Sequence, residues 1–228
     1  MVEFLFIDLD DTILDFHKSE RRAIEKTLTA FGIEPTDEVC TLYSRINKAH
    51  WERLERKELT REQVMLGRFA TLFSELGIVG DPKLCSDTYA SNLAIGHYFL
   101  PGAEEALERL SKKYQLFLAS NGNAAVQDIR LKSANISRFF QDIFISQHLN
   151  ADKPSVQFFE RAFARIPNFD RNRAMIVGDS LTSDILGGNN AGIATCWVNP
   201  KHLPRREDIR VDHQIESLSQ LEGLLESI

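Results

Sequence analysis

The stretch FLFIDLDDT, residues Phe4–Thr12, begins with four apolar residues and ends abruptly in acidic ones. A continuous apolar run of this length is typical of a strand that is buried on both faces, as in a parallel sheet. Because strand side chains alternate, Asp8 and Asp10 are expected on one face, about 6–7 Å apart if the strand stays regular. Two acids this close repel each other in a low dielectric unless a cation, a proton or hydrogen bonds compensate. The pair therefore belongs either to a functional site or to a turn.

Apolar runs like the first one recur along the chain, and helical patterns lie between them. Each run is followed by polar or small residues; the runs are Leu116–Ala119, Ile143–Ile145, Ala174–Val177 and Ala194–Val198. Residues Ala103–Lys113 and Val156–Arg165 carry apolar side chains at helical spacing. Strand–helix alternation of this kind predicts an α/β fold, a doubly wound parallel sheet with right-handed crossovers. The closing stretch is expected to form a charged loop over Lys201–Asp212 and a short helix over Leu218–Leu225.

The alternation stops between residues 17 and 98, where only amphipathic helical patterns appear. A run of about 80 residues without a strand is too long for one crossover connection. We therefore expect two domains: an α/β core formed by residues 1–16 and 99–228, and a helical domain formed by residues 17–98 and inserted into the core. Pro101-Gly102 marks the return to the core, because that pair does not continue a helix.

The composition is that of an ordinary globular protein, with 43% of the 228 residues hydrophobic and 26% charged. The net charge of −6 leaves no basic field to neutralise the phosphates of a nucleic-acid polymer. No apolar run approaches the roughly 20 residues of a membrane helix, and no signal-peptide pattern precedes the first strand. The three cysteines are widely spaced without a C-x-x-C pair, which favours a reducing compartment. We expect a cytoplasmic protein without membrane or nucleic-acid partners, and no pattern indicates an oligomeric state.

Polar residues follow the predicted core strands at their carboxyl ends, where open α/β sheets bind ligands. Asp8–Thr12 follows the first strand and Ser120–Asn123 follows the second. Ala151–Pro154, which contains Lys153, lies beyond the third, and Gly178–Asp184 follows the fourth. Together these segments supply several acids, a hydroxyl group with adjacent backbone N–H groups, and one cation.

Those residue types suit phosphoryl transfer. A carboxylate can attack phosphorus to form an acyl-phosphate, and a second carboxylate can protonate the leaving oxygen and later activate water. Mg²⁺ takes oxygen ligands, commonly one or two carboxylates together with substrate phosphate oxygens, and its charge offsets the repulsion between a carboxylate and a phosphate. A lysine and a serine with neighbouring N–H groups would stabilise the other phosphate oxygens. The site is therefore expected to bind a small phosphorylated metabolite.

Four motifs in this order resemble those of the haloacid dehalogenase (HAD) superfamily phosphatases. They are D-x-D-x-T at Asp8–Thr12, a hydroxyl residue after an apolar strand at Ser120, Lys153 before a proline, and G-D-x-x-x-x-D at Gly178–Asp184. The helical insertion is similar to the C1-type cap of the same superfamily. The resemblance covers the whole core, and it implies a Rossmann-like α/β core, a helical cap over residues 17–98 and Mg²⁺ as the cofactor.

The resemblance also implies a role for each acid of the motifs. Asp8 would be the nucleophile and Asp10 the general acid and base. Both would also be metal ligands, Asp10 through its backbone carbonyl. Asp179 would be a further metal ligand, and Asp184 would order metal-bound water or contact the ligands from behind.

Phosphate binding is implied for Ser120, Asn121 and Lys153, with Lys153 also restraining the nucleophile. Taken singly, each motif has a simpler interpretation, because acids and Ser-Asn-Gly sequences form turns and caps and a lysine at a helix start is usually solvated. Four motifs in the right order, each beside the carboxyl end of a predicted strand, favour a joint site instead. Asp11 is expected to be solvated or to cap a turn.

Asp10 favours a phosphatase over a dehalogenase, because dehalogenases of this superfamily lack the second acid. The segments Phe4–Phe16, Ser120–Gly122 and Cys196–Pro200 resemble the branch that contains pyrimidine 5′-nucleotidases, whereas Ser146–Lys153 departs from it. We therefore expect a hydrolase of a nucleoside 5′-monophosphate or a similar small phosphorylated metabolite. A sugar-phosphate phosphatase and a phosphomutase of the same fold remain alternatives, as does a non-enzymatic module that binds a phosphate ligand or serves in regulation.

Overall fold

The computed structural model describes residues 1–228, and the chain divides into two compact units. Residues Met1–Asp15 and His97–Ile228 form one of them, which contains every strand of the sheet, and we call it the α/β unit. Residues Phe16–Gly96 form the other, which contains only helices and their connections, and we call it the helical unit.

Six parallel strands form the sheet of the α/β unit, in the order β3-β2-β1-β4-β5-β6. The strands are β1 (Phe4–Ile7), β2 (Gln115–Ser120), β3 (Asp142–Ile145), β4 (Ala174–Gly178), β5 (Ala194–Val198) and β6 (His213–Ile215). The predicted α/β fold with its doubly wound parallel sheet is confirmed. The sequence does not predict β6, because this three-residue edge strand pairs only with β5 and has no continuous apolar run.

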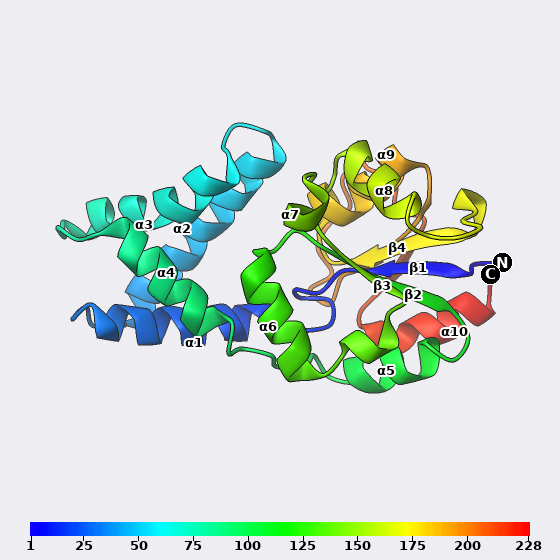
Figure 1. Cartoon of the computed structure of the whole chain (residues 1–228), viewed down its shortest axis with the longest axis horizontal. Helices are drawn as coiled ribbons and strands as arrows, with labels where there is room; N and C mark the ends of the chain where they lie inside the picture. The colour runs from blue at the N-terminus through cyan, green and yellow to red at the C-terminus, as the bar shows by residue number, and fades with distance from the viewer. The chain divides into compact units, whose positions relative to one another are not determined.

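Helices cover both faces of this sheet (Figure 1). α5 (Ala103–Leu110) and α10 (Leu221–Glu226) lie on one face, and α8 (Val156–Phe163) and α9 (Leu186–Ala191) lie on the other. The connections also contain α6 (Ala124–Ala134), α7 (Ser146–Leu149), the 3-10 helices Ser137–Phe139, Arg171–Arg173 and Leu218–Gln220, and a π-helix over Leu181–Ile185. The segment Lys201–Asp212 forms neither helix nor strand, as the sequence predicts.

Alternate side chains of β1 enter two separate hydrophobic clusters. Leu5 and Ile7 pack on the same side as Leu107 of α5, whereas Phe6 packs on the side of Phe163 of α8. The rings of Phe6 and Phe163 meet edge to face, with their centroids 5.4 Å apart. Complete burial of one such side chain stabilises a fold by about 1.5–3 kcal/mol. This two-sided burial explains why a strand without polar alternation lies in the interior of the sheet.

The direction in which strands are added to the sheet reverses at β1. The strands β2 and β3 lie on one side of β1, and β4, β5 and β6 lie on the other. In open α/β sheets a ligand binds at such a point, outside the carboxyl ends of the strands. The register aligns Ile7 of β1 with Leu118 of β2 and Val177 of β4. The residues that follow these three strands therefore meet at one edge of the sheet.

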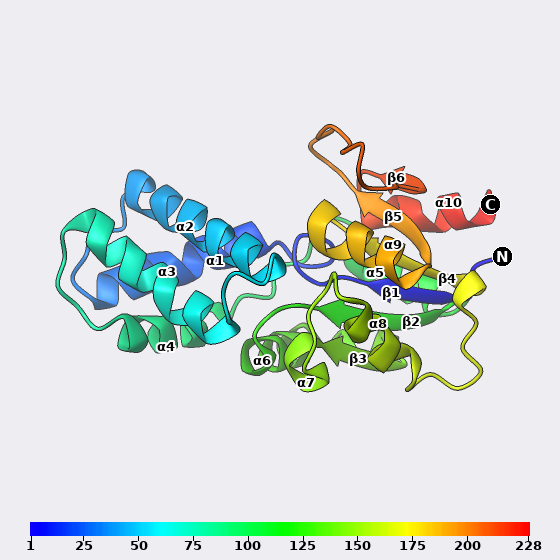
Figure 2. The same ribbon diagram turned by 90° about the horizontal axis from the view of Figure 1, so that it is seen from above.

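Four helices form the helical unit: α1 (Phe16–Ala30), α2 (Asp37–Glu55), α3 (Arg61–Leu76) and α4 (Pro82–Leu93). α1 packs against α4 and α2, and α3 packs against α2 and α4, which gives the bundle seen in Figure 2. Thr60 begins α3 with a capping box, in which its side chain accepts from the Gln63 N–H and the Gln63 side chain accepts from the Thr60 N–H. Asp81 accepts from two backbone N–H groups at the start of α4. Each such cap contributes about 1 kcal/mol.

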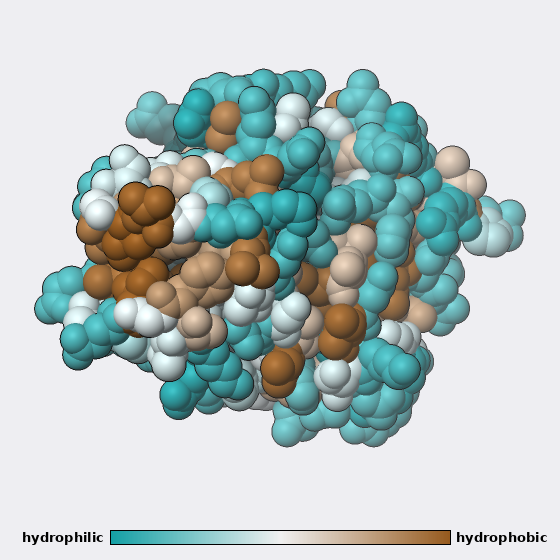
Figure 3. Space-filling view, turned by 60° about the vertical axis from the view of Figure 1, so that its left-hand side comes forward, coloured by the Kyte–Doolittle hydropathy of each residue, from teal (hydrophilic) through white to brown (hydrophobic).

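The surface is mainly polar. Hydrophilic side chains cover most of the face shown in Figure 3, and smaller hydrophobic patches interrupt them. Large exposed hydrophobic side chains of the helical unit include Val79, Leu84 and Ile95. No helix has both the length and the apolarity that crossing a bilayer requires. All three cysteines are buried and unpaired, and the cytoplasmic location stays a prediction.

Candidate functional site

Lys153 lies at the centre of the polar residues that follow the strands. Its side chain is only 1% exposed, and its ammonium group donates three hydrogen bonds. Its Nζ lies 2.7 Å from Asp8 Oδ1, 2.6 Å from Asp184 Oδ1 and 2.5 Å from the carbonyl oxygen of Ala119. Because a buried ammonium group is tolerated only when it is paired and hydrogen-bonded, these contacts fix where the two carboxylates lie.

Asn121 holds the backbone of Lys153 in place. Its Oδ1 accepts from the Lys153 N–H at 2.9 Å, and its Nδ2 donates to the Lys153 carbonyl at 2.8 Å and to Ser183 Oγ at 3.2 Å. The side chain thus ties the end of β2 to the loop between α7 and α8. Since the side chain is engaged in this way, the predicted phosphate contact of Asn121 would come from its backbone N–H.

Three carboxylates gather at the carboxyl ends of β1 and β4. Asp8, Asp179 and Asp184 each offer an oxygen, these oxygens lie within 4.8 Å of one another, and we call the three residues the acidic cluster. Asp8 follows β1 directly, and its backbone N–H donates to the Val177 carbonyl at 2.9 Å. The Asp179 carbonyl accepts from the buried indole Nε1 of Trp197 at 2.8 Å. Contacts with β4 and β5 therefore fix the backbone of Asp8 and of Asp179.

Asp184 belongs to the π-helix Leu181–Ile185, and helices of this type are frequent at functional sites. Its Oδ1 contacts Lys153, and its Oδ2 accepts from the Ser180 N–H at 3.1 Å. A Cβ atom on Gly178 would overlap the Asp184 carboxylate. A glycine at this position therefore leaves the space in which Asp184 reaches Lys153.

Burial and mutual repulsion shift the pKa values of the acidic cluster. Burial, opposed by Lys153 and reinforced by Asp184 and Asp10, raises the pKa of Asp8 to about 8. Burial, reinforced by Asp8 and Asp184, raises the pKa of Asp179 well above its ordinary value. Burial alone would lower the pKa of Lys153, but the flanking carboxylates outweigh it and leave that pKa raised. The site therefore holds a charged lysine among carboxylates that favour a proton or a cation.

The acidic cluster fits a hard divalent cation. Its donor atoms are all carboxylate oxygens, which are the ligands that Mg²⁺ prefers. Three carboxylates around one buried ammonium group leave an excess of negative charge, which a cation would balance. The structure thus brings together two of the predicted metal ligands, Asp8 and Asp179, with Asp184, which is predicted to act behind them. Their individual roles stay predictions.

The carboxylate of Asp10 has partners on α6 that the sequence did not identify. Arg130 Nη1 donates to Asp10 Oδ1 at 2.5 Å, and Gln127 Nε2 donates to Asp10 Oδ2 at 2.7 Å. Both α6 side chains are buried. The sequence indicates these two residues only through their spacing. At that spacing Gln127 and Arg130 lie on the same face of α6 as the buried Val126 and Leu131. Polar residues on an apolar helix face require partners, which the sequence alone does not name.

Ser120 is the last residue of β2, and its hydroxyl group is buried. Its Oγ accepts from the Gly122 N–H at 3.1 Å and from Gln127 Nε2 at 3.0 Å. A serine hydroxyl offers two acceptor positions and one hydrogen. Both acceptor positions are used here, so the O–H is left to donate to a ligand oxygen.

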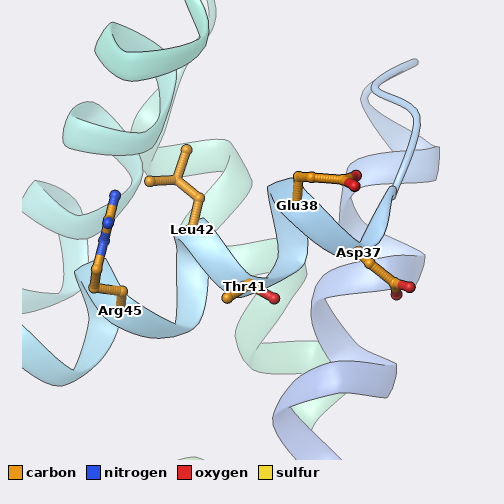
Figure 4. A pocket seen from close by; sticks show the side chains of 5 residues that line it. All are labelled: Asp37, Glu38, Thr41, Leu42 and Arg45. Atoms are coloured by element: carbon orange, nitrogen blue, oxygen red, sulfur yellow. The ribbon is translucent and has the colours of Figure 1, made fainter.

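A pocket of about 400 Å³ lies in the helical unit and is lined by Asp37, Glu38, Thr41, Leu42 and Arg45 of α2 (Figure 4). The two acids stand at one end of this row and the arginine at the other. None of the residues that the sequence nominates for the site lines the pocket. Because the pocket contains none of the motif residues, the candidate site is the one around Lys153.

A family model described as haloacid dehalogenase-like hydrolase matches residues 5–198. Pyrimidine 5′-nucleotidase PynA of Streptococcus pneumoniae is 36% identical over 220 residues, which are 96% of this chain and 93% of that protein. Pyrimidine 5′-nucleotidase YjjG of Escherichia coli is 30% identical over 223 residues, which are 98% and 97% of the two chains. The resemblance inferred from the four sequence motifs is confirmed.

A solved structure supports the same relationship. The HAD-hydrolase YfnB of Bacillus subtilis is 35% identical over 221 residues, which are 97% of this chain and 94% of that protein. Its crystal structure bound to magnesium matches with a TM-score of 0.94 and covers 98% of both chains. The α/β fold and the helical unit therefore recur together in a relative whose structure was determined with the metal.

Proposed function

The chain belongs to the haloacid dehalogenase-like hydrolase family, and we propose that it is a Mg²⁺-dependent phosphatase that releases phosphate from a nucleoside 5′-monophosphate through a phosphoryl group carried on Asp8. The observation that carries this proposal is the acidic cluster with its single buried lysine. An excess of carboxylates around one ammonium group is an arrangement that a divalent cation balances, and a cation held there can also bind a phosphate oxygen.

Asp8 is the nucleophile in this proposal. Lys153 holds one of its carboxylate oxygens at 2.7 Å, which restricts rotation of the carboxylate. An Asp8 oxygen attacks the phosphorus atom and forms an acyl-phosphate, while the ester bond between phosphorus and the 5′ oxygen breaks. A water molecule then attacks the same phosphorus atom, which releases inorganic phosphate and restores the Asp8 carboxylate.

Asp10 moves the proton in both steps. In the first step its carboxyl group gives a proton to the leaving 5′ oxygen, so the nucleoside departs as an alcohol. In the second step the resulting carboxylate takes a proton from the attacking water. Over the whole cycle one water molecule is consumed, one ester bond is broken, and Asp10 returns to its protonated form.

Asp8 and Asp179 would hold Mg²⁺ together with the backbone carbonyl of Asp10. Asp184 would stand behind these ligands, where its contact with Lys153 fixes its orientation. When bound, Mg²⁺ would neutralise the phosphate charge that otherwise repels the attacking carboxylate. The oxygen donor set and the magnesium in the structure of YfnB support this assignment.

Ser120, Lys153 and the backbone N–H of Asn121 would hold the phosphate oxygens. The Ser120 hydroxyl has a hydrogen left to donate, because its oxygen already accepts twice. Lys153 supplies the positive charge, held between Asp8 and Asp184. Donors that are fixed before the reaction stabilise charge on the equatorial oxygens without reorganisation.

We further propose that the α/β unit is the catalytic core and that the helical unit is a cap, which selects the substrate and excludes water from the reacting phosphorus. Two observations support this division. All the residues nominated for chemistry lie in the α/β unit, and the helical unit is inserted directly after the first motif, between Asp15 and His97.

Pyrimidine nucleoside 5′-monophosphates are the proposed substrates. The support is that two relatives named pyrimidine 5′-nucleotidase align with more than nine-tenths of this chain, at 36% and 30% identity. These alignments span both units, so they include the helical unit, in which substrate selection is proposed to reside.

The test is phosphate release from a panel of pyrimidine and purine nucleoside 5′-monophosphates and sugar phosphates, with Mg²⁺ and with a chelator. We expect the highest kcat/KM for a pyrimidine nucleotide and no turnover in the chelator. Asp8→Asn abolishes turnover, because a neutral amide cannot form the acyl-phosphate. The matched control is Asp208→Asn, which changes an exposed acid paired with Arg206 and leaves turnover unchanged.

Each other outcome contradicts a different part of the proposal. Faster turnover of a sugar phosphate than of any nucleotide would contradict the substrate class alone. Movement of the phosphoryl group to a second position on a sugar, without release of inorganic phosphate, would identify a phosphomutase. No turnover of any ester would identify a module that only binds phosphate.

A further inference from the structure

Both oxygens of the Asp10 carboxylate are held by one helix, α6. Arg130 Nη1 donates to Oδ1 at 2.5 Å, and Gln127 Nε2 donates to Oδ2 at 2.7 Å. The two α6 side chains also contact each other, since Arg130 Nη1 lies 2.8 Å from Gln127 Oε1. We call Gln127 and Arg130 the α6 clamp. The carboxylate it holds is thereby fixed in both position and rotation.

The α6 clamp is buried, although the carboxylate it holds is not. The side chain of Arg130 is 1% exposed and that of Asp10 is 25% exposed. Removing a guanidinium group from water is costly, and a pair of hydrophobic side chains in place of a buried ion pair is often neutral or stabilising for the fold. Stability alone therefore does not account for an arginine at this position, whereas a requirement to hold Asp10 does.

The space for the α6 clamp depends on Gly122. A Cβ atom on Gly122 would overlap the Gln127 side chain, including the Nε2 that contacts Asp10. The same Nε2 also donates to Ser120 Oγ at 3.0 Å. Gln127 therefore lies between the carboxylate of Asp10 and the hydroxyl group of Ser120, and it contacts both with one amide nitrogen.

We propose that Gln127 and Arg130 are positioning residues, which fix the Asp10 carboxyl group for proton transfer and tie its orientation to the Ser120 hydroxyl. This inference rests on the proposed function, because it concerns the proton that Asp10 passes to the leaving oxygen. The α6 clamp touches neither the phosphate nor the leaving group in this account. Its effect on the leaving group passes through Asp10, and Arg130 tests this most cleanly because the second contact, with Ser120 Oγ, is made by Gln127.

The leaving group separates this role from a structural one. The value of kcat/KM reports the steps up to the first irreversible one, which here is phosphoryl transfer to Asp8 with departure of the alcohol. A nucleoside leaves as a poor alkoxide unless it receives a proton, whereas p-nitrophenolate leaves without one. Misplacement of Asp10 must therefore lower kcat/KM for the nucleotide and leave that for p-nitrophenyl phosphate nearly unchanged.

The experiment compares the two esters in the full-length wild type, Arg130→Met and Gln127→Met, all with Mg²⁺. We expect both variants to lose about 100-fold in kcat/KM for a pyrimidine nucleoside 5′-monophosphate, the loss typical of a misplaced catalytic group. For p-nitrophenyl phosphate we expect a change of at most about threefold in Arg130→Met, and a larger one in Gln127→Met only to the extent that its contact with Ser120 Oγ matters. Lys132→Met, which removes an exposed cation from the same helix, is the matched control and changes neither value.

A double-mutant cycle with Asp10→Ala tests whether the α6 clamp acts through Asp10. In the Asp10→Ala background, Arg130→Met and Gln127→Met are expected to change kcat/KM for the nucleotide by less than about twofold, because their target is already absent. Losses that multiply with that of Asp10→Ala would overturn the inference. Gln127→Met replaces one neutral side chain by another, so it keeps the test valid if Arg130→Met fails to fold.

The remaining outcomes separate this inference from the proposed function. Equal losses for both esters would show a structural role for the α6 clamp, and they would overturn the inference while leaving the phosphatase intact. Turnover of both esters that is unaffected by either variant would do the same. If the wild type hydrolyses neither ester, the proposed function is wrong, and the inference is wrong with it.

Discussion

The two units both bury charged side chains, but they balance the charge differently. In the helical unit Glu20 accepts from Ser44 Oγ and from Asn47 Nδ2, both at 2.6 Å, and Arg68 Nη1 donates to Asn47 Oδ1 at 2.9 Å. We call these four residues the Glu20–Arg68 network. It contains one carboxylate and one guanidinium group. In the α/β unit, by contrast, the three carboxylates of the acidic cluster share one ammonium group, that of Lys153.

The buried charges of the Glu20–Arg68 network are balanced within the fold. Those of the acidic cluster leave an excess of negative charge, which a bound cation would balance. Glu20 and Arg68 are each 4% exposed and have neutral hydrogen-bonding partners between them, so their charges cancel inside the bundle. The acidic cluster lacks that balance, and the pKa of Asp8 is raised to about 8 as a result of burial and of its acidic neighbours. Buried charge is costly in either place, but only in the α/β unit would adding a divalent cation remove the imbalance.

The largest expected effect on stability comes from breaking the balanced charges of the helical unit. Arg68→Met leaves the Glu20 carboxylate buried without its cation, and it should lower the free energy of unfolding by about 3 kcal/mol. Chemical denaturation of the full chain measures this. Arg22→Met, which removes an exposed arginine from α1, is the control and should change the value by less than about 0.5 kcal/mol. Equal stability of the two variants would contradict a structural role for the Glu20–Arg68 network.

A smaller effect, on the affinity for Mg²⁺, is expected when the geometry of the acidic cluster is disturbed. Gly178→Ala places a Cβ atom where the Asp184 carboxylate lies, and it should weaken Mg²⁺ binding about 10–100-fold, as displaced groups behind metal ligands do. The fluorescence of Trp197, whose indole contacts the Asp179 carbonyl, reports binding in a Trp51→Phe background.

The matched control for that change is Gly223→Ala in α10, where the added Cβ atom has no neighbour within 4 Å. It should leave the Mg²⁺ affinity unchanged. An unchanged affinity in Gly178→Ala as well would mean that Asp184 has no part in the metal site.

A pH dependence of stability is also expected, and only the unbalanced charges produce it. Burial above all raises the pKa of Asp8 from 3.8 to about 8, so between these values the folded chain keeps a proton that the unfolded chain has lost. The stability of the metal-free protein should therefore fall as the pH rises through this interval. Asp8→Asn removes this contribution, so the stability of the wild type minus that of the variant should decrease with rising pH.

Denaturation of both proteins in a chelator, at several pH values across that interval, measures the difference. A difference that is constant or that grows with pH would contradict the account of Asp8. Arg68→Met should show no such trend relative to the wild type, because the charges of the Glu20–Arg68 network are balanced.

The strand ends could be predicted from the sequence because their signal is local. A run such as Phe4–Ile7 is apolar throughout only when both of its faces are buried, and the residues after it then lie at a known edge of the sheet. The pattern of apolar runs alone therefore indicates Asp8, Asp179 and Lys153 as neighbours. It does not reveal β6, because an edge strand of three residues with one partner carries no such run.

The partners of these residues could not be predicted, because they are set by packing between distant segments. Gln127 and Arg130 lie 117 and 120 residues from Asp10 along the chain. In the sequence Asn121 resembles a turn residue. Its side chain nevertheless binds the backbone of Lys153, which lies 32 residues further along the chain. A helix face with two polar residues indicates that partners exist, but only the fold identifies them.

The most direct test of the central claim is to locate the phosphoryl group during turnover. A reaction with a pyrimidine nucleoside 5′-monophosphate is quenched rapidly in acid, and the digested protein is examined by mass spectrometry. We expect a phosphoryl group on the peptide that contains Asp8, present with Mg²⁺ and absent in the chelator and in Asp8→Asn. Steady turnover with the phosphoryl group on another residue, or with none on the chain, would contradict the central claim.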